Sequence, residues 1–335
     1  MAETLKLALV GCGAIADWHE QAIREVPEVE ISAAIDVDAA KAEAMAKKAG
    51  ARAFTSLAEG AASGCFDAAL LMLPHHLHEA IALEALGAGV HVMLEKPMAP
   101  TVGACARILA AAEQASGRFM LAEKAQYWPE IAIAQEALDA GAIGDIVTAR
   151  VQLFFPPMEQ YYGGDKVWRM DKQAAGGGLS IDTGSHYIRP LRMWLGEIDE
   201  VVAAMETPFP GMEGESLARA LFRFRSGTVA SFDLLLTKGA IAPQEIFRIT
   251  GTEGEIVIGA GVKLYNEENR RGLKLAEDIP QGYMVSYVGQ MRDFANAILH
   301  DQPLAAEAEY SLGELRTALA MEHSAETRRW EKVWD

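Results

Sequence analysis

The sequence has few cysteines and no apolar run long enough to span a membrane. Its three cysteines, Cys12, Cys65 and Cys105, show no C-x-x-C or metal-ligand spacing, which argues against a disulfide scaffold and against a zinc site. No apolar stretch reaches the ~18 residues that a membrane-spanning helix needs, and the first residues do not resemble a signal peptide. We therefore expect a protein of the reduced cytoplasm, without a bound metal and without a membrane partner.

Positive charge is also scarce. The chain has 30 lysines and arginines against 47 aspartates and glutamates, which gives a formal net charge of −17. Such a surface repels a phosphate backbone, so we do not expect a nucleic acid as a partner, whereas a small neutral substrate is compatible with it. With 50% hydrophobic and 23% charged residues, the 335-residue chain is typical of a packed globular protein of about two domains.

A glycine-rich turn lies near the start of the chain, between a predicted strand and a predicted helix. The apolar run 5–10 is typical of a buried strand, and the sequence Gly11-Cys-Gly13-Ala-Ile-Ala16 follows it directly. This G-x-G-x-x-A pattern fits dinucleotide binding, because Gly11 permits a tight turn, Gly13 lets the backbone approach a pyrophosphate, and Ala16 allows close helix packing. The first N–H groups of the helix favour an anion at the same place.

Asp36 follows the second predicted strand, over residues 29–35, and lies 20 residues after Ala16. That is the distance at which a dinucleotide-binding fold places a carboxylate for the ribose hydroxyls of NAD. The same carboxylate would repel the 2′-phosphate of NADP, and Val37 offers that phosphate no positive charge. The pattern therefore predicts NAD rather than NADP. The alternative is a structural glycine turn, with Asp36 as a helix cap.

Strand and helix patterns alternate through residues 1–123, which predicts an α/β domain with a doubly wound parallel sheet. Ligands of such a fold are expected outside the carboxyl ends of its strands. Strands dominate after residue 123, with one helix expected over about 179–195, and the last ~50 residues return to helix. Residues 124–335 are therefore predicted to form an α+β domain with a large, mostly antiparallel sheet. We leave open that its C-terminal segment packs back on the first domain.

Five motifs in order along the chain resemble the Gfo/Idh/MocA family, which includes glucose–fructose oxidoreductase and inositol dehydrogenase. They are the glycine turn, Asp36, Pro74-His-His-Leu-His78, Ala88-Gly-Val-His-Val-Met-Leu-Glu95-Lys96-Pro97 and Gly176-Gly-Gly-Leu-Ser-Ile-Asp182-Thr-Gly-Ser-His186. The resemblance covers nearly the whole chain. It implies a Rossmann domain, a sheet domain for substrate binding and oligomerisation, bound NAD(H) or NADP(H), hydride exchange with a sugar or polyol hydroxyl, and a homodimer or homotetramer.

Lys96 is the first candidate for a catalytic residue. It lies at the carboxyl end of a predicted buried strand and beside a proline, where an ordinary surface lysine is unexpected. An amine at that edge suits proton exchange with a hydroxyl, or polarisation of that hydroxyl. The alternative is a structural ion pair with Glu95. The sequence leaves open whether the Lys96–Pro97 bond is cis.

Asp182 and His186 are the other two catalytic candidates. They are four residues apart on a predicted helix and would share one of its faces. An imidazole can accept a hydroxyl proton near neutral pH while hydride leaves the carbon, and Asp182 can orient the substrate or the imidazole. The alternative is an aspartate near a helix start and a histidine of the core. Which of Lys96 and His186 takes the first proton stays open.

The resemblance also assigns binding residues. For the cofactor they are Gly11, Gly13, Ala14, Ile15, Asp36, Pro74, His78, Glu95 and Lys96, and for the substrate Lys96, Gln126, Trp168, Arg169, Asp182 and His186.

The family often carries an arginine before the proline at position 129, and its absence here weakens the case for an anionic substrate. The adjacent histidines at 75 and 76 are poorly suited to chelation. The rings of Tyr161, Tyr162 and Trp168 can stack on a sugar or pack in the fold.

We therefore predict an NAD-dependent dehydrogenase that acts on a CH–OH group of a sugar, an inositol or a related polyol. Alternatives that keep the same site are an NAD-dependent glycosidase that uses transient oxidation, an aryl-diol dehydrogenase, and a ketone or imine reductase. A different class is a non-catalytic NAD-binding regulator. The joint presence of Lys96, Asp182 and His186 argues against such a regulator.

Overall fold

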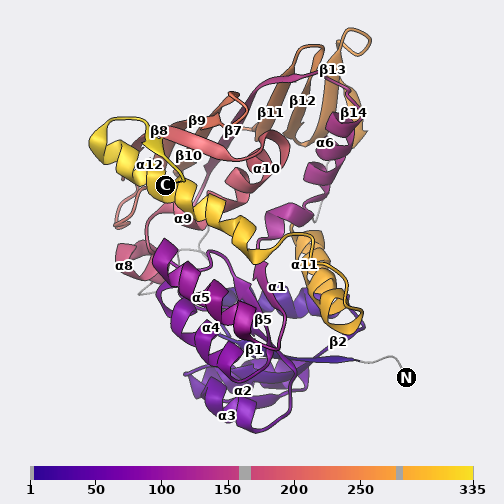
Figure 1. The fold of residues 1–335 in the computed structure, drawn as a ribbon, viewed down its shortest axis with the longest axis vertical. Helices are drawn as coiled ribbons and strands as arrows, with labels where there is room; N and C mark the ends of the chain where they lie inside the picture. The colour runs from indigo at the N-terminus through magenta and orange to yellow at the C-terminus, as the bar shows by residue number, and fades with distance from the viewer. Residues whose placement is uncertain (1–3, 158–166, 277–281, 335) are drawn as a thin grey trace. The chain divides into compact units, whose positions relative to one another are not determined.

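The computed structural model describes residues 4–157, 167–276 and 282–334, and the chain divides into two compact units (Figure 1). Unit 1 comprises residues 1–124 and 284–312, and unit 2 comprises residues 125–283 and 313–335. The chain therefore leaves unit 1 after Lys124 and returns to it at Met284. Tyr161 and Tyr162, considered above for sugar stacking, lie outside the described residues.

Unit 1 alternates strands and helices. Its elements are β1 (Leu5–Val10), α1 (Ala14–Ile23), β2 (Val29–Ile35), α2 (Ala39–Ala49), β3 (Arg52–Phe54), α3 (Leu57–Ala62), β4 (Ala68–Leu71), η1 (His75–Leu77), α4 (His78–Gly87), β5 (His91–Glu95), α5 (Val102–Gln114), β6 (Phe119–Ala122), α11 (Gly282–Leu299) and η4 (Ala308–Ser311). The strands form one sheet in the order β3-β2-β1-β4-β5-β6, and every neighbouring pair is parallel. This order confirms the predicted doubly wound fold.

Local chemistry sets the ends of several of these helices. The side chains of Asp38, Ser56 and Thr101 accept hydrogen bonds from backbone N–H groups in the first turns of α2, α3 and α5. Gly50 ends α2 in the left-handed conformation, with φ at 73°. All four residues of β4 are buried, as expected for a strand with helices over both faces of its sheet.

The returning segment adds the helix α11 to unit 1, and Figure 1 shows it beside α1. Tyr287 of α11 is 1% exposed. Its ring meets the edge of the His19 imidazole with the centroids 4.8 Å apart, and it lies 6.3 Å from the ring of Trp18. Burial of aromatic surface therefore joins a helix near the end of the chain to the first helix.

Unit 2 is built on a large sheet. Its elements are η2 (Lys124–Tyr127), α6 (Pro129–Asp139), β7 (Ile146–Phe155), η3 (Trp168–Met170), α8 (Lys172–Ala175), α9 (Leu179–Asp182), α10 (Ser185–Leu195), β8 (Ile198–Glu206), β9 (Leu217–Phe224), β10 (Val229–Leu236), β11 (Phe247–Gly251), β12 (Gly254–Gly259), β13 (Gly261–Asn266), β14 (Leu273–Ala276), α12 (Leu312–Thr327) and β15 (Glu331–Lys332). The nine strands lie in the order β14-β13-β12-β11-β7-β10-β9-β8-β15. Only the central β7–β10 pair is parallel, which confirms the predicted mostly antiparallel sheet.

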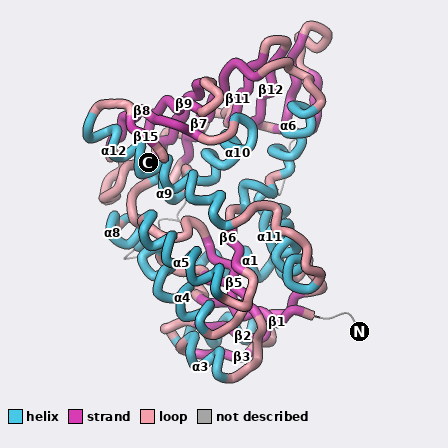
Figure 2. The backbone as a smooth tube through the Cα atoms, in the orientation of Figure 1, coloured by secondary structure: helices cyan, strands magenta, loops and turns pink. Residues whose placement is uncertain are grey.

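The two faces of this sheet differ. Along β9 the residues at 218, 220, 222 and 224 are buried, whereas Arg219, Leu221 and Arg223 are exposed. The buried set belongs to a core that α6 and α10 share, and Figure 2 shows these helices along one face of the strands. The alternation of period two is therefore that of a sheet with one packed face.

No helix in the described part of the chain combines the length and the apolar character that crossing a membrane requires.

Candidate active site

The glycine turn of unit 1 has the shape of a pyrophosphate cradle. Gly11 has φ at 92°, and a Cβ there would lie 2.2 Å from the carbonyl oxygen of Met72, so a side chain is excluded. Gly13 is exposed, and a Cβ placed on it would meet no atom within 4 Å. Gly13 precedes α1 and has no side chain to cap it. The N–H groups of Ala14 and Ile15, in the first turn of α1, can therefore donate hydrogen bonds to an anion at the turn.

Asp36 lies beside this turn with its carboxylate held at both oxygens. Oδ2 accepts the N–H of Cys12 at 2.8 Å, and Oδ1 accepts the N–H of Asp38 at 2.9 Å. The half-buried carboxylate retains lone pairs that can accept hydrogen bonds from the ribose hydroxyls. Burial and the negative charge of Asp36 raise the pKa of Cys12 to about 11, so this thiol stays protonated and unreactive at neutral pH. The residues present therefore fit the adenosine half of a dinucleotide.

Lys96 follows β5 at the carboxyl edge of the same sheet. The preceding residue, Glu95, directs both carboxylate oxygens back into the protein: Oε2 accepts the N–H of Lys96 at 3.2 Å, and Oε1 lies 2.7 Å from Nε2 of His19. The Lys96–Pro97 bond, left open by the sequence, is cis. Lys96 itself is half-buried.

His78 is fully buried at the start of α4. Its Nδ1 lies 2.8 Å from the carbonyl oxygen of Pro97, and its Nε2 lies 2.8 Å from that of Leu73. Burial lowers the pKa of His78 against the raising effect of these two contacts. The ring of His75 is 5.5 Å away, and Pro74 precedes the short helix η1. Among the described residues, no three histidine, cysteine or carboxylate side chains are arranged to hold a metal ion.

Two residues of unit 1 belong to this edge although the sequence analysis did not propose them. His19, on α1, is completely buried against Glu95. Lys124, two residues after β6, is 5% exposed, and its Nζ lies 5.7 Å from the ring centre of Tyr287. The available sequence signal for Lys124 was a lysine shortly after an apolar strand, because Lys96 directly follows the neighbouring strand β5.

In unit 2 the prediction of a single helix over 179–195 is wrong. The chain forms two helices there, α9 and α10, with a break at Thr183 and Gly184. Both Thr183 and Gly184 direct their N–H groups to the carbonyl of Leu179, and a Cβ on Gly184 would lie 2.5 Å from the carbonyl oxygen of Ser180. Asp182 therefore ends the first helix, and His186 lies in the first turn of the second.

The glycine triplet before α9 allows close packing of backbone on backbone. A Cβ on Gly178 would lie 2.3 Å or less from atoms of Glu215. The backbone carbonyl of Glu215 accepts the N–H of Leu179 at 3.0 Å, and its carboxylate accepts the N–H of Ser180 at 2.7 Å. Glu215 thus accepts hydrogen bonds from the N–H groups at the amino end of α9, and this positions Asp182 one turn later.

Asp182 is 4% exposed and forms an ion pair with Arg169, whose Nε lies 3.2 Å from Oδ2. The guanidinium of Arg169 in turn covers the ring of Trp168 at 4.2 Å. The structure therefore brings together three of the predicted substrate-binding residues.

His186 is 7% exposed and lies beside the ring of Trp128, with the centroids 6.0 Å apart. One turn later on α10, Arg189 donates from Nη1 to the amide oxygen of Gln126 at 2.7 Å and from Nε to Glu314 at 2.9 Å. The guanidinium missing from the motif around Gln126 is thus supplied from another helix. Sequence reasoning missed this arginine because its partner lies 63 residues away.

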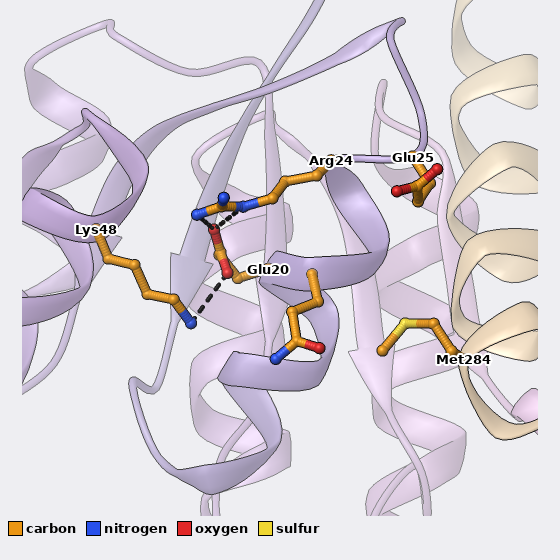
Figure 3. A pocket seen from close by; sticks show the side chains of 6 residues that line it. Glu20, Arg24, Glu25, Lys48 and Met284 are labelled. Carbon is orange, nitrogen blue, oxygen red and sulfur yellow. Dashed lines mark hydrogen bonds and ion pairs between the residues drawn. The ribbon is translucent and has the colours of Figure 1, made fainter. Parts of the chain in front are cut away.

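A surface hollow of about 380 Å³ lies elsewhere in unit 1, against the second half of α1 (Figure 3). Its lining includes the buried Glu20, whose carboxylate pairs with Arg24 at 2.5 Å and with Lys48 at 3.0 Å. Met284 of α11 borders it on another side. Because its charges neutralise one another and it lies at the opposite end of α1 from the glycine turn, we assign it no part in the active site.

Both halves of the chain match models of one protein family. Residues 5–123 match the "Oxidoreductase family, NAD-binding Rossmann fold", and residues 131–257 match the "GFO/IDH/MocA C-terminal domain". The 1,5-anhydro-D-fructose reductase of Ensifer adhaerens is 30% identical over 330 residues, which are 95% of this chain and 96% of that protein. The levoglucosan dehydrogenase of Pseudarthrobacter phenanthrenivorans is 27% identical over 67% of this chain and 63% of that protein.

Solved structures agree with this match. An oxidoreductase from Thermotoga maritima has a TM-score of 0.87 at 28% identity, with 99% of both chains covered. A levoglucosan dehydrogenase in complex with NADH has a TM-score of 0.88 at 22% identity, again with 99% of both chains covered, which shows the shared fold. The two family matches together span most of the chain, so this chain belongs to the Gfo/Idh/MocA family of NAD-binding oxidoreductases.

Proposed function

We propose that this chain is a dehydrogenase that transfers a hydride between NAD(H) and a CH–OH group of a sugar, an inositol or a related polyol. The observation that carries the proposal is Lys96, held by its backbone at the carboxyl edge of a sheet whose glycine turn and Asp36 fit NAD. Relatives named as anhydrofructose reductase, levoglucosan dehydrogenase and inositol 2-dehydrogenase support the substrate class.

The cofactor would be held by unit 1. The turn at Gly11 and Gly13, with the first N–H groups of α1, would bind the pyrophosphate, and Asp36 would accept the ribose hydroxyls. Pro74 and Lys96, at the ends of neighbouring strands, would border the nicotinamide end. His78 and Glu95 would act from behind them, because their polar atoms already contact the protein. When bound, NAD supplies the atom that accepts the hydride.

The residues of the chain would then manage the proton and the orientation of the substrate. When a secondary alcohol is oxidised, its carbon loses a hydride and its hydroxyl loses a proton, which needs an acceptor at the oxygen. We assign this proton to the imidazole of His186 or to the amine of Lys96, and we assign to Lys96 the polarisation of the reacting oxygen. Asp182, fixed by Arg169, would bind a second hydroxyl of the substrate.

The indole ring of Trp168, beside the ion pair of Asp182 and Arg169, further supports a sugar-like substrate. Trp168 carries Arg169 over one face, and an aromatic surface of this kind suits the C–H face of a sugar ring. Gln126 contributes its amide nitrogen as a donor, since its oxygen already accepts from Arg189. The buried guanidinium of Arg189 is paired with Glu314, so it adds no net positive charge for an anionic substrate.

A substrate panel tests the proposal. Inositols, aldoses, anhydrosugars and glycosides are incubated with the purified protein and NAD, and both NADH formation and hydrolysis are measured. We expect NADH with at least one polyol or sugar and no hydrolysis. Hydrolysis without net NADH would instead indicate a glycosidase that oxidises transiently. Tight NAD binding without either product would indicate a regulator.

Asp36 provides a prediction about cofactor choice. The protein is expected to use NAD with a KM at least about tenfold below that for NADP, because the carboxylate repels a 2′-phosphate. In Asp36→Ser this difference should shrink, mainly through a higher KM for NAD. The measurement is initial rates at varied NAD and NADP. Val37→Ala, which changes a 94% exposed neighbour, is the control and should keep the preference. A wild-type preference for NADP would contradict the role of Asp36.

We also propose a homodimer or homotetramer in the cytoplasm. The face of the nine-stranded sheet that carries Arg219, Leu221 and Arg223 offers an exposed surface with Leu221 42% exposed, and a second copy could cover it. The low cysteine content, three residues in the whole sequence, suits a reducing compartment. Sedimentation velocity at micromolar concentration distinguishes these assemblies from a monomer.

A further inference from the structure

The residue before Lys96 is anchored to the first helix through a buried histidine. His19 lies one turn inside α1, is 0% exposed, and places Nε2 at 2.7 Å from Oε1 of Glu95. Its ring is fixed from a second direction by the edge-on contact with Tyr287 of α11. Glu95 is largely buried, with 13% of its side chain exposed. Burying a carboxylate in this way is costly unless it is paired and hydrogen-bonded.

The other oxygen of Glu95 completes the connection, because it accepts the backbone N–H of Lys96 at 3.2 Å. Burial by itself raises the pKa of Glu95. The hydrogen bond from His19 and the positive charges of His19, Lys96 and Lys124 together outweigh it, so the pKa lies below its usual value. The carboxylate is therefore ionised at neutral pH and accepts hydrogen bonds through both oxygens.

The residue after Lys96 is anchored in the same manner. His78, also 0% exposed, places Nδ1 at 2.8 Å from the carbonyl oxygen of Pro97 and Nε2 at 2.8 Å from that of Leu73. Leu73 follows β4, the strand next to β5, so the ring lies between the ends of two neighbouring strands, and as a neutral imidazole it donates to one of the two carbonyl oxygens. Lys96 thus lies between two backbone positions that separate buried imidazoles hold.

We propose that His19, acting through Glu95, and His78, acting through Pro97, are positioning residues that fix the backbone of Lys96. The proposal rests on the proposed role of Lys96 in the reaction. Its physical basis is that a catalytic group must be held within a fraction of an ångström, because a shift of about 1 Å can lower a rate by roughly 100-fold. Neither histidine needs to touch the substrate or NAD.

The first experiment compares His19→Ala with His19→Gln. We expect His19→Ala to lower kcat by about 10- to 100-fold with little change in KM for NAD, because Lys96 loses its fixed position while the glycine turn remains. The amide nitrogen of glutamine can reach the place of Nε2 and donate to Glu95, so His19→Gln should recover most of the loss. An unchanged kcat in His19→Ala would overturn the proposal for this residue.

For His78, two substitutions separate the two contacts of its ring. The amide of His78→Asn lies near the place of Nδ1 and can keep the contact with Pro97, whereas that of His78→Gln lies near Nε2 and can keep the contact with Leu73. If the contact with Pro97 positions Lys96, His78→Asn retains more of the wild-type kcat than His78→Gln. The reverse order would contradict this part of the proposal.

His91→Ala is the matched control. His91 lies on the same strand, β5, but at its other end, where it accepts the N–H of Arg118 at 2.8 Å. Its removal also deletes a hydrogen-bonded imidazole from the same strand, but kcat should stay within about twofold of the wild type.

In a Lys96→Ala background, His19→Ala should lower kcat by less than about a further threefold, since both residues act through one amine. A full additional loss would show that His19 acts elsewhere.

A readout without substrate or NAD separates this proposal from the proposed function. Trace acetylation followed by peptide mass spectrometry reports the reactivity of Lys96 relative to the exposed Lys332. We expect His19→Ala and His78→Gln to raise this ratio by at least about threefold, because a released lysine is more accessible, and His91→Ala to leave it unchanged. If the wild type oxidises no substrate but the ratio rises, only the proposed function fails. An unchanged ratio in an active protein overturns the positioning role.

Discussion

Lys96→Ala is expected to lower kcat by about 10²- to 10⁴-fold, the usual contribution of a group that handles a proton in the transition state. Its affinity for NAD should change by less than about threefold. The reason is that the glycine turn, the amino end of α1 and Asp36 hold the dinucleotide with groups that the substitution leaves in place. Steady-state rates with the best substrate of the panel give kcat, and NADH fluorescence titration gives the affinity.

Two further variants give this prediction its controls. Lys96→Arg keeps the positive charge but replaces a compact amine by a planar group that does not release a proton, so most of the loss should persist. Lys332→Ala removes a surface lysine that pairs with Asp199 on unit 2, and its kcat should equal that of the wild type. A Lys96→Ala protein that turns over at more than about a third of the wild-type rate would contradict the role given to Lys96.

Glu314→Ala is expected to lower the free energy of unfolding by about 3–5 kcal/mol, because it removes the carboxylate that pairs with two buried guanidinium groups. Glu314 is 3% exposed and faces two guanidinium groups, those of Arg189 and Arg192, each of which is 1% exposed. Arg192 keeps a second carboxylate, Glu197, at 2.5 Å. Arg189 keeps its contact with the neutral amide of Gln126. The loss of stability is expected to be large because the charge of Arg189 is buried.

Urea unfolding followed by tryptophan fluorescence measures this effect. The matched control is Glu267→Ala, which removes a carboxylate that also pairs with an arginine, Arg270, but with side chains 91% and 77% exposed. Water solvates both charges there, so no measurable change is expected. If Glu314→Ala unfolds at the same urea concentration as Glu267→Ala, the buried network does not stabilise the fold. Because Arg189 also holds Gln126 near the start of α10, a lower kcat is expected together with the lower stability.

The parts of the fold that follow from neighbouring residues were predicted correctly. The alternation of apolar strands with helices of regular spacing indicated the parallel sheet, and the structure has it in the order β3-β2-β1-β4-β5-β6. Ser56 at the start of α3 and Gly50 at the end of α2 are local in the same way, because capping involves atoms only a few residues away. The family and its NAD-binding fold were recognisable for the same reason, since each of the motifs is a short continuous stretch.

The helix predicted over 179–195 failed where a long-range contact decides the backbone. The apolar spacing favours one helix, but Gly184 packs against the carbonyl of Ser180, and Glu215, from a segment 35 residues away, satisfies the amino end of α9. The separation of Asp182 from His186 by a break follows from this packing. Periodicity reports which residues prefer to be buried, and it does not report which distant carboxylate caps a turn.

The class of the protein was already legible in the chain: a glycine turn follows one strand, an acidic residue follows the next strand, and lysine and histidine motifs come in a fixed order. Each of these depends on spacing along the chain, which sets the geometry of one turn or one strand. The groups that support these motifs became visible in the folded chain alone. His19 holds Glu95 across 76 residues, Arg189 meets Glu314 across 125, and the chain returns at Met284 to bury His19 under Tyr287. Contacts of this kind exist only after the chain has closed long loops around a common core, so no local pattern records them.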